Sequence, residues 1–290
     1  MEPRGQYYSP DLIVYLDPFS PISETFKTIR TNIDFSSIDK QLKTIAVTST
    51  CQAEGKSTVS ANLAIAYAQV DKKVLLLDAD LRRPNIHKLF GLLNRRGLTS
   101  ALISKRDHQE FIQETLTDNL YVLTSGPVPP NPTEMLMSAA FSSLIETLKS
   151  AFDLIIIDAP PVMGLADAVI ISAKVDGMIY VVRVGVVDRK QLQYATNSLK
   201  QIKANVIGFV LNGVKQDSEN YYYAYNYNYS SDSEKRKKKR KKTAEPYYEK
   251  GPVSQSGKIT KSASQMPVLR APTLSDKLPN EEEKSKIGKD

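Results

Sequence analysis

The chain has 290 residues, which is long enough for one full α/β core and a tail. It contains one cysteine, Cys51, and two histidines, and this excludes a disulfide framework and the usual zinc sites. No apolar run approaches the roughly 20 residues that cross a bilayer, and the N-terminus lacks a signal-peptide core. These properties predict a protein of the reducing cytoplasm that is soluble, or attached to a membrane only through a partner.

The net charge of +7 is concentrated at one end of the chain. Residues 231–290 contain 16 Lys and Arg but only 9 Asp and Glu, whereas the preceding 230 residues contain 23 of each kind. The excess of basic residues therefore belongs to a C-terminal appendage and says nothing about the partners of the folded part.

Residues 1–20 contain three prolines and little periodicity, so we expect an irregular N-terminal segment. In the next stretch, Ile22, Phe26, Ile29 and Ile33 follow each other at spacings of 4, 3 and 4. This spacing predicts an amphipathic helix over 21–36, with Ser23 as a plausible N-cap.

Short apolar runs then alternate with helical patterns. The runs show no polar alternation, which is typical of strands that are covered on both faces. Alternating strands and helices predict an α/β fold with a doubly wound, mainly parallel sheet and helices on both faces. The expected strands are 44–48, 73–80, 121–126, 153–160, 176–185 and 205–214, and the clearest expected helices are 56–70, 132–149 and 188–203.

The composition changes after Val214, so we place the end of the folded domain there and assign 21–214 to it. Residues 215–230 form a tyrosine-rich cluster, and 231–290 form a basic tail that begins with the run 235–242. Low hydrophobicity and blocks of charge predict a disordered C-terminal tail. The basic run could contact anionic lipid or nucleic-acid phosphates, and a tail that is simply solvated is the alternative to both.

The stretch "TSTCQAEGKSTVSANLA" (48–64) follows the first apolar run and ends like a phosphate-binding P-loop, although Thr50 stands at the first glycine position. Backbone N–H groups of such a loop surround the β-phosphate, the lysine reaches the β- and γ-phosphates, and the hydroxyl after it binds the metal ion. The loop therefore predicts an ATP site formed by Gln52, Ala53, Glu54, Gly55, Lys56, Ser57 and Thr58.

Aspartates close two further apolar runs. Asp78 and Asp80 follow one strand, and Asp158 follows another. Ligands of doubly wound sheets bind outside the carboxyl ends of the strands, so these carboxylates and the loop should converge on one edge. Magnesium prefers oxygen ligands and usually takes one or two carboxylates together with phosphates and water. We therefore expect an Mg²⁺ site at this edge.

Together these motifs resemble the bacterial tyrosine kinases of the capsule and exopolysaccharide type, the CpsD/CapB family. That family has a modified Walker A motif S-x-x-P-G-E-G-K-S-T, a second motif D-x-D-x-R and a Walker B motif that ends D-x-P-P. The corresponding stretches here are "STCQAEGKST" (49–58), "LLLDADLR" (75–82) and "IIIDAPP" (155–161). Gln52 and Ala53 replace the Pro and Gly of the family's loop, and the similarity spans about residues 20–230.

The resemblance implies an ATP-dependent protein-tyrosine kinase of P-loop NTPase type that regulates polysaccharide synthesis. Lys56, Asp78 and Asp80 would be catalytic, with Asp78 accepting the proton of the tyrosine hydroxyl or orienting that hydroxyl. Ser57, Asp80 and Asp158 would bind Mg²⁺, directly or through water. The chain would phosphorylate its own tyrosine cluster in trans, and the acceptors would be Tyr221, Tyr222, Tyr223, Tyr225, Tyr227 and Tyr229.

The same resemblance implies partners. Glu24, Lys27 and Arg30 correspond to the E-x-x-R-x-x-R helix that packs relatives into rings, with Lys27 in place of the first Arg. A membrane-embedded activator, the polysaccharide co-polymerase protein, would hold the kinase at the inner face of the membrane, and a cognate tyrosine phosphatase would reverse its reaction. No specific nucleic acid is expected.

Two other functions fit parts of the pattern. A ParA/MinD-like ATPase that switches on membrane or DNA shares the sheet and the Walker B strand, but it needs a signature lysine where this chain has Cys51. A nucleotide-binding scaffold without transferase activity is the third possibility, because two consensus residues of the loop are replaced.

Overall fold

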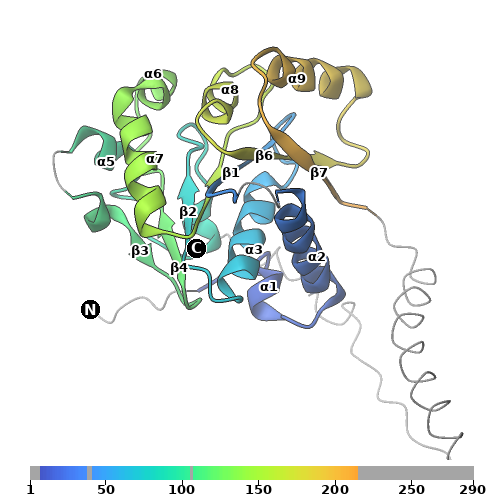
Figure 1. Cartoon of the computed structure of the whole chain (residues 1–290), viewed down its shortest axis with the longest axis horizontal. Helices are drawn as coiled ribbons and strands as arrows, with labels where there is room; N and C mark the ends of the chain where they lie inside the picture. The colour runs from blue at the N-terminus through green and yellow to red at the C-terminus, as the bar shows by residue number, and fades with distance from the viewer. Residues whose placement is uncertain (1–6, 38–40, 105–106, 215–290) are drawn as a thin grey trace, which may run out of the picture. The chain divides into compact units, whose positions relative to one another are not determined.

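The computed structural model describes residues 7–37, 41–104 and 107–214. Within these ranges, seven strands form one sheet in the order β3-β4-β2-β5-β1-β6-β7, and only the short edge strand β3 is antiparallel (Figure 1). A central β1 flanked by β5 and β6 is the arrangement of a doubly wound sheet, which confirms the predicted fold class. The strands are β1 Thr44–Ser49, β2 Val74–Asp78, β3 Gln113–Glu114, β4 Leu120–Leu123, β5 Leu154–Asp158, β6 Gly177–Arg183 and β7 Val206–Asn212.

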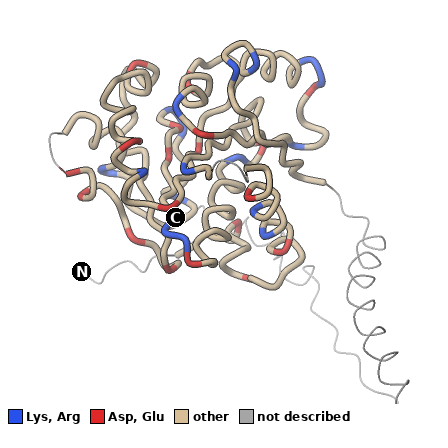
Figure 2. The backbone as a smooth tube through the Cα atoms, viewed as in Figure 1, with Lys and Arg blue, Asp and Glu red and all other residues tan. Residues whose placement is uncertain are grey.

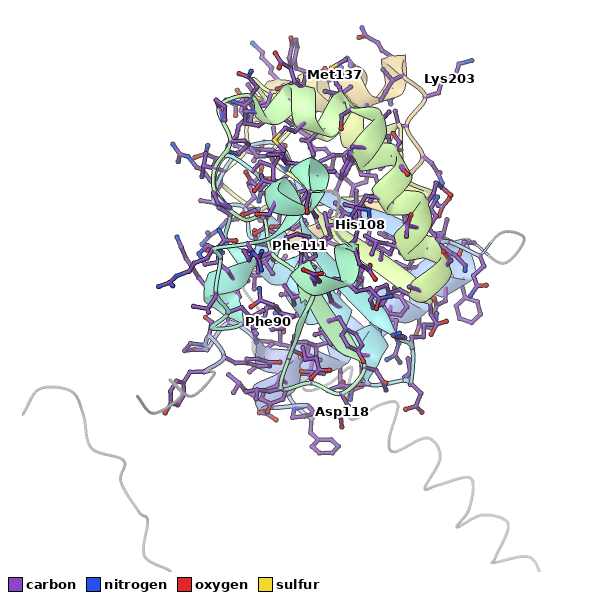
Figure 3. The ribbon with its side chains drawn as sticks, turned by 90° about the vertical axis from the view of Figure 1, so that its left-hand side faces the viewer. Phe90, His108, Phe111, Asp118, Met137 and Lys203 are labelled. Atoms are coloured by element: carbon purple, nitrogen blue, oxygen red, sulfur yellow. The ribbon has the colours of Figure 1, made fainter. Side chains whose placement is uncertain are left out.

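Helices cover both faces of this sheet. One face packs against α1 Ile13–Leu16, α2 Pro21–Ser36, α3 Lys56–Ala68 and α4 Ile86–Leu89. The other face packs against α5 Leu98–Ile103, the 3₁₀ turn η1 His108–Phe111, α6 Pro132–Met137, α7 Ala139–Ala151, α8 Asp167–Ser172 and α9 Arg189–Gln201. Figure 3 shows Phe111 on η1 and Met137 at the end of α6, on the side of the second group.

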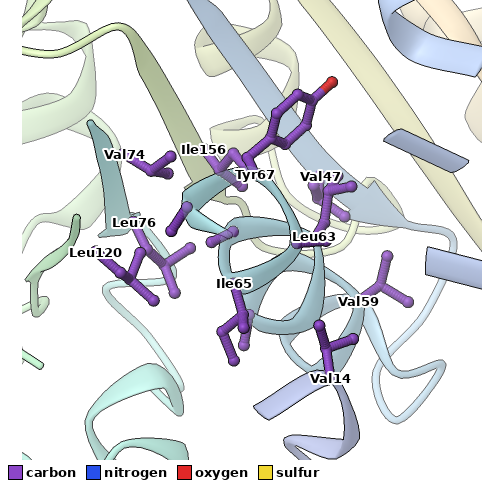
Figure 4. Close-up of a cluster of buried hydrophobic side chains, with 14 of the residues drawn as sticks. Val14, Val47, Val59, Leu63, Ile65, Tyr67, Val74, Leu76, Leu120 and Ile156 are labelled. Carbon is purple, nitrogen blue, oxygen red and sulfur yellow. The ribbon is translucent and has the colours of Figure 1, made fainter. Parts of the chain in front are cut away.

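The two faces build two separate hydrophobic clusters. In β2, Leu76 points to the cluster around α3, while Leu75 and Leu77 point to the cluster around α7. Figure 4 shows Leu76 beside Ile65 and other residues of the first cluster. The central strands β1, β2 and β5 are therefore buried at every position and mainly apolar, because both faces are covered, as the sequence predicted.

The edge strand β7 departs from this pattern. Phe209 is 55% exposed and Leu211 is 63% exposed, although both occur in a run that reads as fully buried. The run predicted the strand correctly, but an apolar run carries no information about which strand lies at the edge of the sheet.

Two helix boundaries also differ from expectation. The serine that caps α2 is Ser20, whose hydroxyl accepts from the backbone N–H of Ser23 at 3.2 Å, and Pro21 occupies the first turn. The expected helix 132–149 is broken at Ser138, which caps α7 by accepting from Phe141 N at 3.1 Å. Local hydrogen bonds to serine therefore decided both boundaries.

The expectation of an irregular N-terminal segment is wrong for residues 13–16, which form a short helix. Leu12 and Val14 are fully buried, and Val14 lies in the short helix α1. Asn62 of α3 fixes this segment, because its side chain accepts from Val14 N at 3.0 Å and donates to Asp11 O at 2.8 Å. A four-residue helix is too short to show a period in the sequence, so its contribution to the core was missed.

The predicted tyrosine cluster and basic tail lie outside the described residues. In the described part, positively and negatively charged residues are interspersed along the backbone (Figure 2), as expected from the balanced charge of the first 230 residues. Among these residues no helix is both long and apolar enough to cross a membrane.

We predict that Asn62→Ala lowers the free energy of unfolding by about 1–3 kcal/mol, because it leaves the buried N–H of Val14 without its acceptor. Urea denaturation followed by circular dichroism measures this. Asn32→Ala, at an exposed position of α2, is the matched control and should change stability by less than about 0.5 kcal/mol. Equal stability of the two variants would show that residues 7–20 are not part of the cooperative core.

Candidate active site

The predicted site residues meet at the carboxyl ends of β1, β2 and β5. Asp78 and Asp158 are paired in register as the last residues of their strands, and Asp80 follows two residues after β2. Lys56 and Ser57 are the first residues of α3, which starts directly after the loop that leaves β1. Parallel strand ends therefore bring together the loop and all three aspartates.

The ammonium group of Lys56 lies between two of these carboxylates. Its Nζ is 2.8 Å from Asp80 Oδ2 and 3.6 Å from Asp158 Oδ2, and the lysine is only 9% exposed. Burial lowers the pKa of Lys56, but the charges of Asp158 and Asp80 outweigh this effect and raise the pKa above its ordinary value. Lys56 therefore stays charged and neutralises the carboxylates beside it.

Asp158 is fully buried and holds two serine hydroxyls of α3. Its Oδ2 accepts from Ser57 Oγ at 2.6 Å, and its Oδ1 accepts from Ser60 Oγ at 3.1 Å. Burial raises the pKa of this carboxyl, while Lys56 and the Ser57 hydroxyl act in the opposite direction. The hydrogen bond to Asp158 orients the Ser57 hydroxyl, so a cation bound to that hydroxyl would lie close to the Asp158 carboxylate.

The oxygen atoms of Ser57, Asp80 and Asp158 fit magnesium in kind and number. Mg²⁺ usually binds proteins through one or two carboxylates and completes its octahedron with substrate phosphates and water. Across 7–37, 41–104 and 107–214, no group of three or more His, Cys, Asp and Glu side chains forms a complete metal cage.

Asp78 is placed differently from what its expected catalytic role requires. It is fully buried, its Oδ1 accepts from Asp80 N at 3.2 Å, and its Oδ2 accepts from Asn85 N at 3.2 Å and Ile86 N at 3.1 Å. Burial, followed by the nearby charge of Asp158, raises the pKa of this carboxyl. Both oxygens are therefore committed to the backbone that shapes residues 79–86. Substitution at Asp78 would therefore remove the acceptor of three backbone N–H groups.

The loop has a left-handed backbone conformation at Ala53, where the usual motif has glycine. Ala53 has a φ of 63°, which costs a residue with a Cβ about 1 kcal/mol relative to glycine. Gly55 has a φ of 92°, and a Cβ there would lie 2.2 Å from Asn212 Nδ2. Thr50 stands at the first glycine position of the motif. Its side chain is fully buried, and its hydroxyl accepts a hydrogen bond from Tyr180 OH at 3.0 Å.

Glu54 braces this loop from inside, a role that the sequence did not reveal. Its side chain is fully buried and accepts from the backbone N–H of Cys51 and, at 3.1 Å, of Arg183. Arg183 in turn donates to Ala53 O at 3.0 Å, and Asn212 Nδ2 donates to Glu54 O at 2.8 Å. Residues at the ends of β6 and β7 therefore hold the strained loop in place. These contacts join residues far apart in the sequence, so the sequence alone could not predict them.

A cleft of about 490 Å³, here called the lysine cleft, opens in front of the loop. Lys56 and Ser57 line it from α3, Asp80 and Arg83 line it from the segment after β2, and Arg183 lines it from β6. Two arginines and a lysine around one cleft favour an anionic ligand, and the N-terminus of α3 adds backbone N–H groups to the same space.

Arg82 of the D-x-D-x-R motif is fixed away from the lysine cleft. Its Nε donates to Asp167 Oδ2 at 2.6 Å, and its Nη2 donates to Thr133 Oγ1 at 2.9 Å. Thr133 belongs to the stretch "GPVPPNPTEML" and itself donates to Asp167 Oδ1 at 2.6 Å. These three side chains tie the segment after β2 to α6 and α8.

The three expected oligomerisation residues make contacts inside the chain. Lys27 and Glu24 form an ion pair of 2.7 Å on the surface of α2, and Arg30 donates to the carbonyl of Ala66 near the end of α3. All three side chains are half-buried. The six expected acceptor tyrosines lie outside the described residues.

Comparisons with known proteins agree with this geometry. The sequence model of a family described as an AAA domain matches residues 42–210. The tyrosine-protein kinase YwqD of Bacillus subtilis (strain 168) is 42% identical over 219 residues, which cover 76% of this chain and 92% of YwqD. The "putative tyrosine-protein kinase CapB" of Staphylococcus aureus is 38% identical over 211 residues, which cover 73% of this chain and 92% of that protein.

Among solved structures, the kinase domain of the Escherichia coli tyrosine kinase ETK superposes with a TM-score of 0.70 at 32% identity, covering 75% of this chain and 85% of that domain. Identity of this level across almost the whole length of a relative shows common descent. The chain belongs to the bacterial tyrosine-protein kinases of capsule and exopolysaccharide biosynthesis.

Proposed function

We propose that this kinase transfers the γ-phosphate of ATP to tyrosines of its own C-terminal cluster, mainly between subunits, and that the lysine cleft binds the nucleotide. The observation that carries the proposal is the position of Lys56, whose ammonium lies at the entrance of α3 between two buried carboxylates. A lysine at this point reaches the β- and γ-phosphates of a nucleotide in a P-loop.

In the reaction, the tyrosyl oxygen forms a bond to the γ-phosphorus while the bond from that phosphorus to the β–γ bridging oxygen breaks. ADP leaves, and the hydroxyl proton passes to Asp80 and then to solvent. The chain contributes mainly position and charge, as in other phosphoryl transfers. Lys56, Arg83 and Arg183 balance the negative charge of the phosphates at the cleft.

Ser57, Asp80 and Asp158 would hold the magnesium ion that accompanies ATP. When bound, the ion neutralises charge on the phosphate oxygens and helps to align them. Ser57 offers its hydroxyl from the first turn of α3, and Asp158 orients that hydroxyl through its 2.6 Å hydrogen bond. Lys56 would then leave Asp80 and contact phosphate.

Asp80 suits the proton-accepting role better than Asp78. It lies within the lining of the lysine cleft, whereas both oxygens of Asp78 accept from buried backbone N–H groups. We therefore assign Asp78 to shaping the segment 79–86, and we keep Asp80 as the residue closest to the transferred group.

The acceptor tyrosines follow the site closely in the sequence. Tyr221 comes nine residues after Asn212, the last residue of β7, and Asn212 touches the loop through Glu54. Nine extended residues span about 30 Å, which is enough to reach the rim of a neighbouring subunit. A ring of subunits joined through Glu24, Lys27 and Arg30 would place such neighbours side by side.

We further propose that a membrane-embedded activator recruits the kinase to the inner face of the membrane and that a tyrosine phosphatase resets it, as the resemblance implies. The sequence argues against a switch ATPase of ParA/MinD type, because Cys51 cannot supply the cationic side chain of its signature lysine. A scaffold without transferase activity would have no need for Lys56 and Asp80 to line one cleft.

Lys56→Met should abolish tyrosine phosphorylation, because it removes the charge that would bind the phosphates. Purified protein is incubated with γ-labelled ATP, and phosphotyrosine is separated from free phosphate. Lys43→Met, a surface substitution far from the loop, is the control and should retain activity. Label on tyrosine in Lys56→Met would refute the P-loop assignment, and free phosphate alone from the native chain would favour a switch ATPase.

Ala53→Gly should stabilise the protein by up to about 1 kcal/mol and leave kinase activity the same or higher, because glycine adopts the left-handed backbone without strain. Gly55→Ala should do the opposite, since its methyl group would collide with Asn212. Thermal unfolding and initial rates report both effects. A loss of stability in Ala53→Gly would show that the loop does not strain the alanine.

Mixing two inactive proteins tests transfer between subunits. One carries Lys56→Met and intact tyrosines, and the other carries a native loop with all six acceptor tyrosines changed to Phe. The label from γ-labelled ATP should appear on the Lys56→Met chain, because only that chain offers acceptors. An unlabelled mixture, with native protein labelled in parallel, would mean that transfer occurs within one chain.

A further inference from the structure

The two edges of the sheet are protected to different degrees. The edge strand β3 is two residues long, Gln113 and Glu114, and one of them is charged. The edge strand β7 is seven residues long and contains no charged residue and no proline (Figure 1). No strand of the described ranges pairs with its outer side. Proteins protect such an edge by shortness, charge, proline or a covering segment, so we expect a further segment to cover β7.

One face of β7 is also open to water. Phe209 and Leu211 pair in register with Tyr180 and Val182 of β6, so their side chains lie on the face of the cluster around α7. Tyr180 is fully buried there and contacts the Phe209 ring at a centroid distance of 5.5 Å, but Phe209 and Leu211 are more than half exposed. On the other face, Val210 packs against the cluster around α3. The exposed apolar surface of β7 therefore lies on one face, beside the free edge.

The tyrosine cluster, which lies outside the described residues, has a sequence that suits this edge. Tyrosine occupies every second position from 221 to 229, and the positions between hold Tyr222, Ala224, Asn226 and Asn228. Large aromatic residues that alternate with mainly small or polar ones are typical of a strand with one buried face. Residues 213–220 separate the cluster from β7, and a connection of this length is usual between neighbouring elements. A short connection of this kind joins antiparallel strands.

We propose that residues 221–229, when unphosphorylated, add to β7 of the same chain as a further, antiparallel strand. The alternate tyrosines cover Phe209 and Leu211, and the backbone of the cluster pairs with the free N–H and C=O groups of the edge. The effect of phosphorylation on this docking rests on the proposed function. The docking itself gives the cluster a place on its own subunit when it is not in an active site.

Phosphorylation acts against this docking. Transfer of the γ-phosphoryl group from ATP, with ADP as the other product, gives a tyrosine about −1.5 to −2 charges. These charges would lie against Phe209 and Leu211, where an unpaired charge is costly because it loses its contact with water. Phosphates on alternate tyrosines of one strand would also repel each other. The cluster therefore leaves β7 on phosphorylation, and the edge becomes free.

Amide hydrogen exchange of residues 206–212 tests the docking in the full chain, treated with a tyrosine phosphatase and kept without ATP. Ala224→Pro removes a backbone N–H from the middle of the cluster, and Ala263→Pro makes the same change farther along the tail. The outward-pointing amides of β7 should exchange about tenfold faster, or more, in Ala224→Pro than in the native chain, because local opening exposes them. Ala263→Pro should match the native chain. Equal exchange in all three proteins would overturn the proposal.

Cleavage by chymotrypsin, which cuts after tyrosine, tests the contact with the exposed face. Leu211→Ser should speed cleavage within 221–229 about threefold or more, because it weakens the docked state. Leu93→Ser, at a leucine exposed to a similar degree, is the matched control and should cleave like the native chain. Equal rates in the two variants would contradict the contact. The native rate should not change when the protein is diluted tenfold, and a rate that rises on dilution would overturn docking within one chain, since it would show that a second copy covers the edge.

Incubation with ATP and Mg²⁺ tests the release. Phosphotyrosine should form in the cluster, and the exchange of β7 in the native chain should rise to the level of Ala224→Pro. Phosphotyrosine in the cluster with β7 still protected would overturn the release step. If β7 is protected in the dephosphorylated chain but ATP yields no phosphotyrosine on any protein, the docking is supported and the proposed function itself fails.

Discussion

The placement of one ammonium group among buried carboxylates determines the rest of this site. Asp158 ends a central strand with no exposure to water, and such a carboxylate is costly unless a positive charge or hydrogen bonds compensate it. Lys56 and the hydroxyls of Ser57 and Ser60 supply that compensation from the first turns of α3. The helix must therefore begin immediately above the strand end, and the loop between β1 and α3 must be as short and as tightly turned as it is.

The tight turn explains the supports around the loop. Ala53 holds a left-handed conformation that glycine would adopt without cost, and the structure compensates with a buried glutamate, an arginine and an asparagine from three different elements. Glu54 is central to this arrangement because it links the loop to β6 through its side chain and to β7 through its carbonyl group. Asn212, the last residue of β7, therefore connects the end of the sheet to the loop by a hydrogen bond to Glu54 O.

Much of the fold could be read from the sequence because it depends on patterns that local segments carry. Six of the strands and the long helices α2, α3 and α9 follow from apolar runs and from spacing, and the aspartates after β2 and β5 follow from the rule on strand ends. Short elements such as α1, α4 and β3 carry too few residues to show a period. Their positions depend on tertiary contacts, as the bonds of Asn62 to residues 11 and 14 illustrate.

The candidate site also contains residues that the sequence predicted and residues that only tertiary contacts reveal. The motifs predicted that Lys56, Ser57, Asp80 and Asp158 would lie together, and the structure brings them within contact distance of one another. They could not separate Asp78 from Asp80, because both precede the same turn, and only the three backbone N–H groups around Asp78 distinguish a structural carboxylate from one that lines the cleft. Nor could they reveal the hydrogen bond between the side chains of Gln52 and Arg83, whose partners are 31 residues apart.

A crystal structure of this chain with magnesium and a non-hydrolysable ATP analogue tests the central claim most directly. The quantity to measure is the distance from Lys56 Nζ to Asp80 Oδ2, which is 2.8 Å here. The account predicts that this ion pair opens, that Nζ contacts the β- and γ-phosphates, and that Ser57 Oγ contacts the metal ion. A nucleotide bound elsewhere, with Lys56 still paired to Asp80, would contradict it.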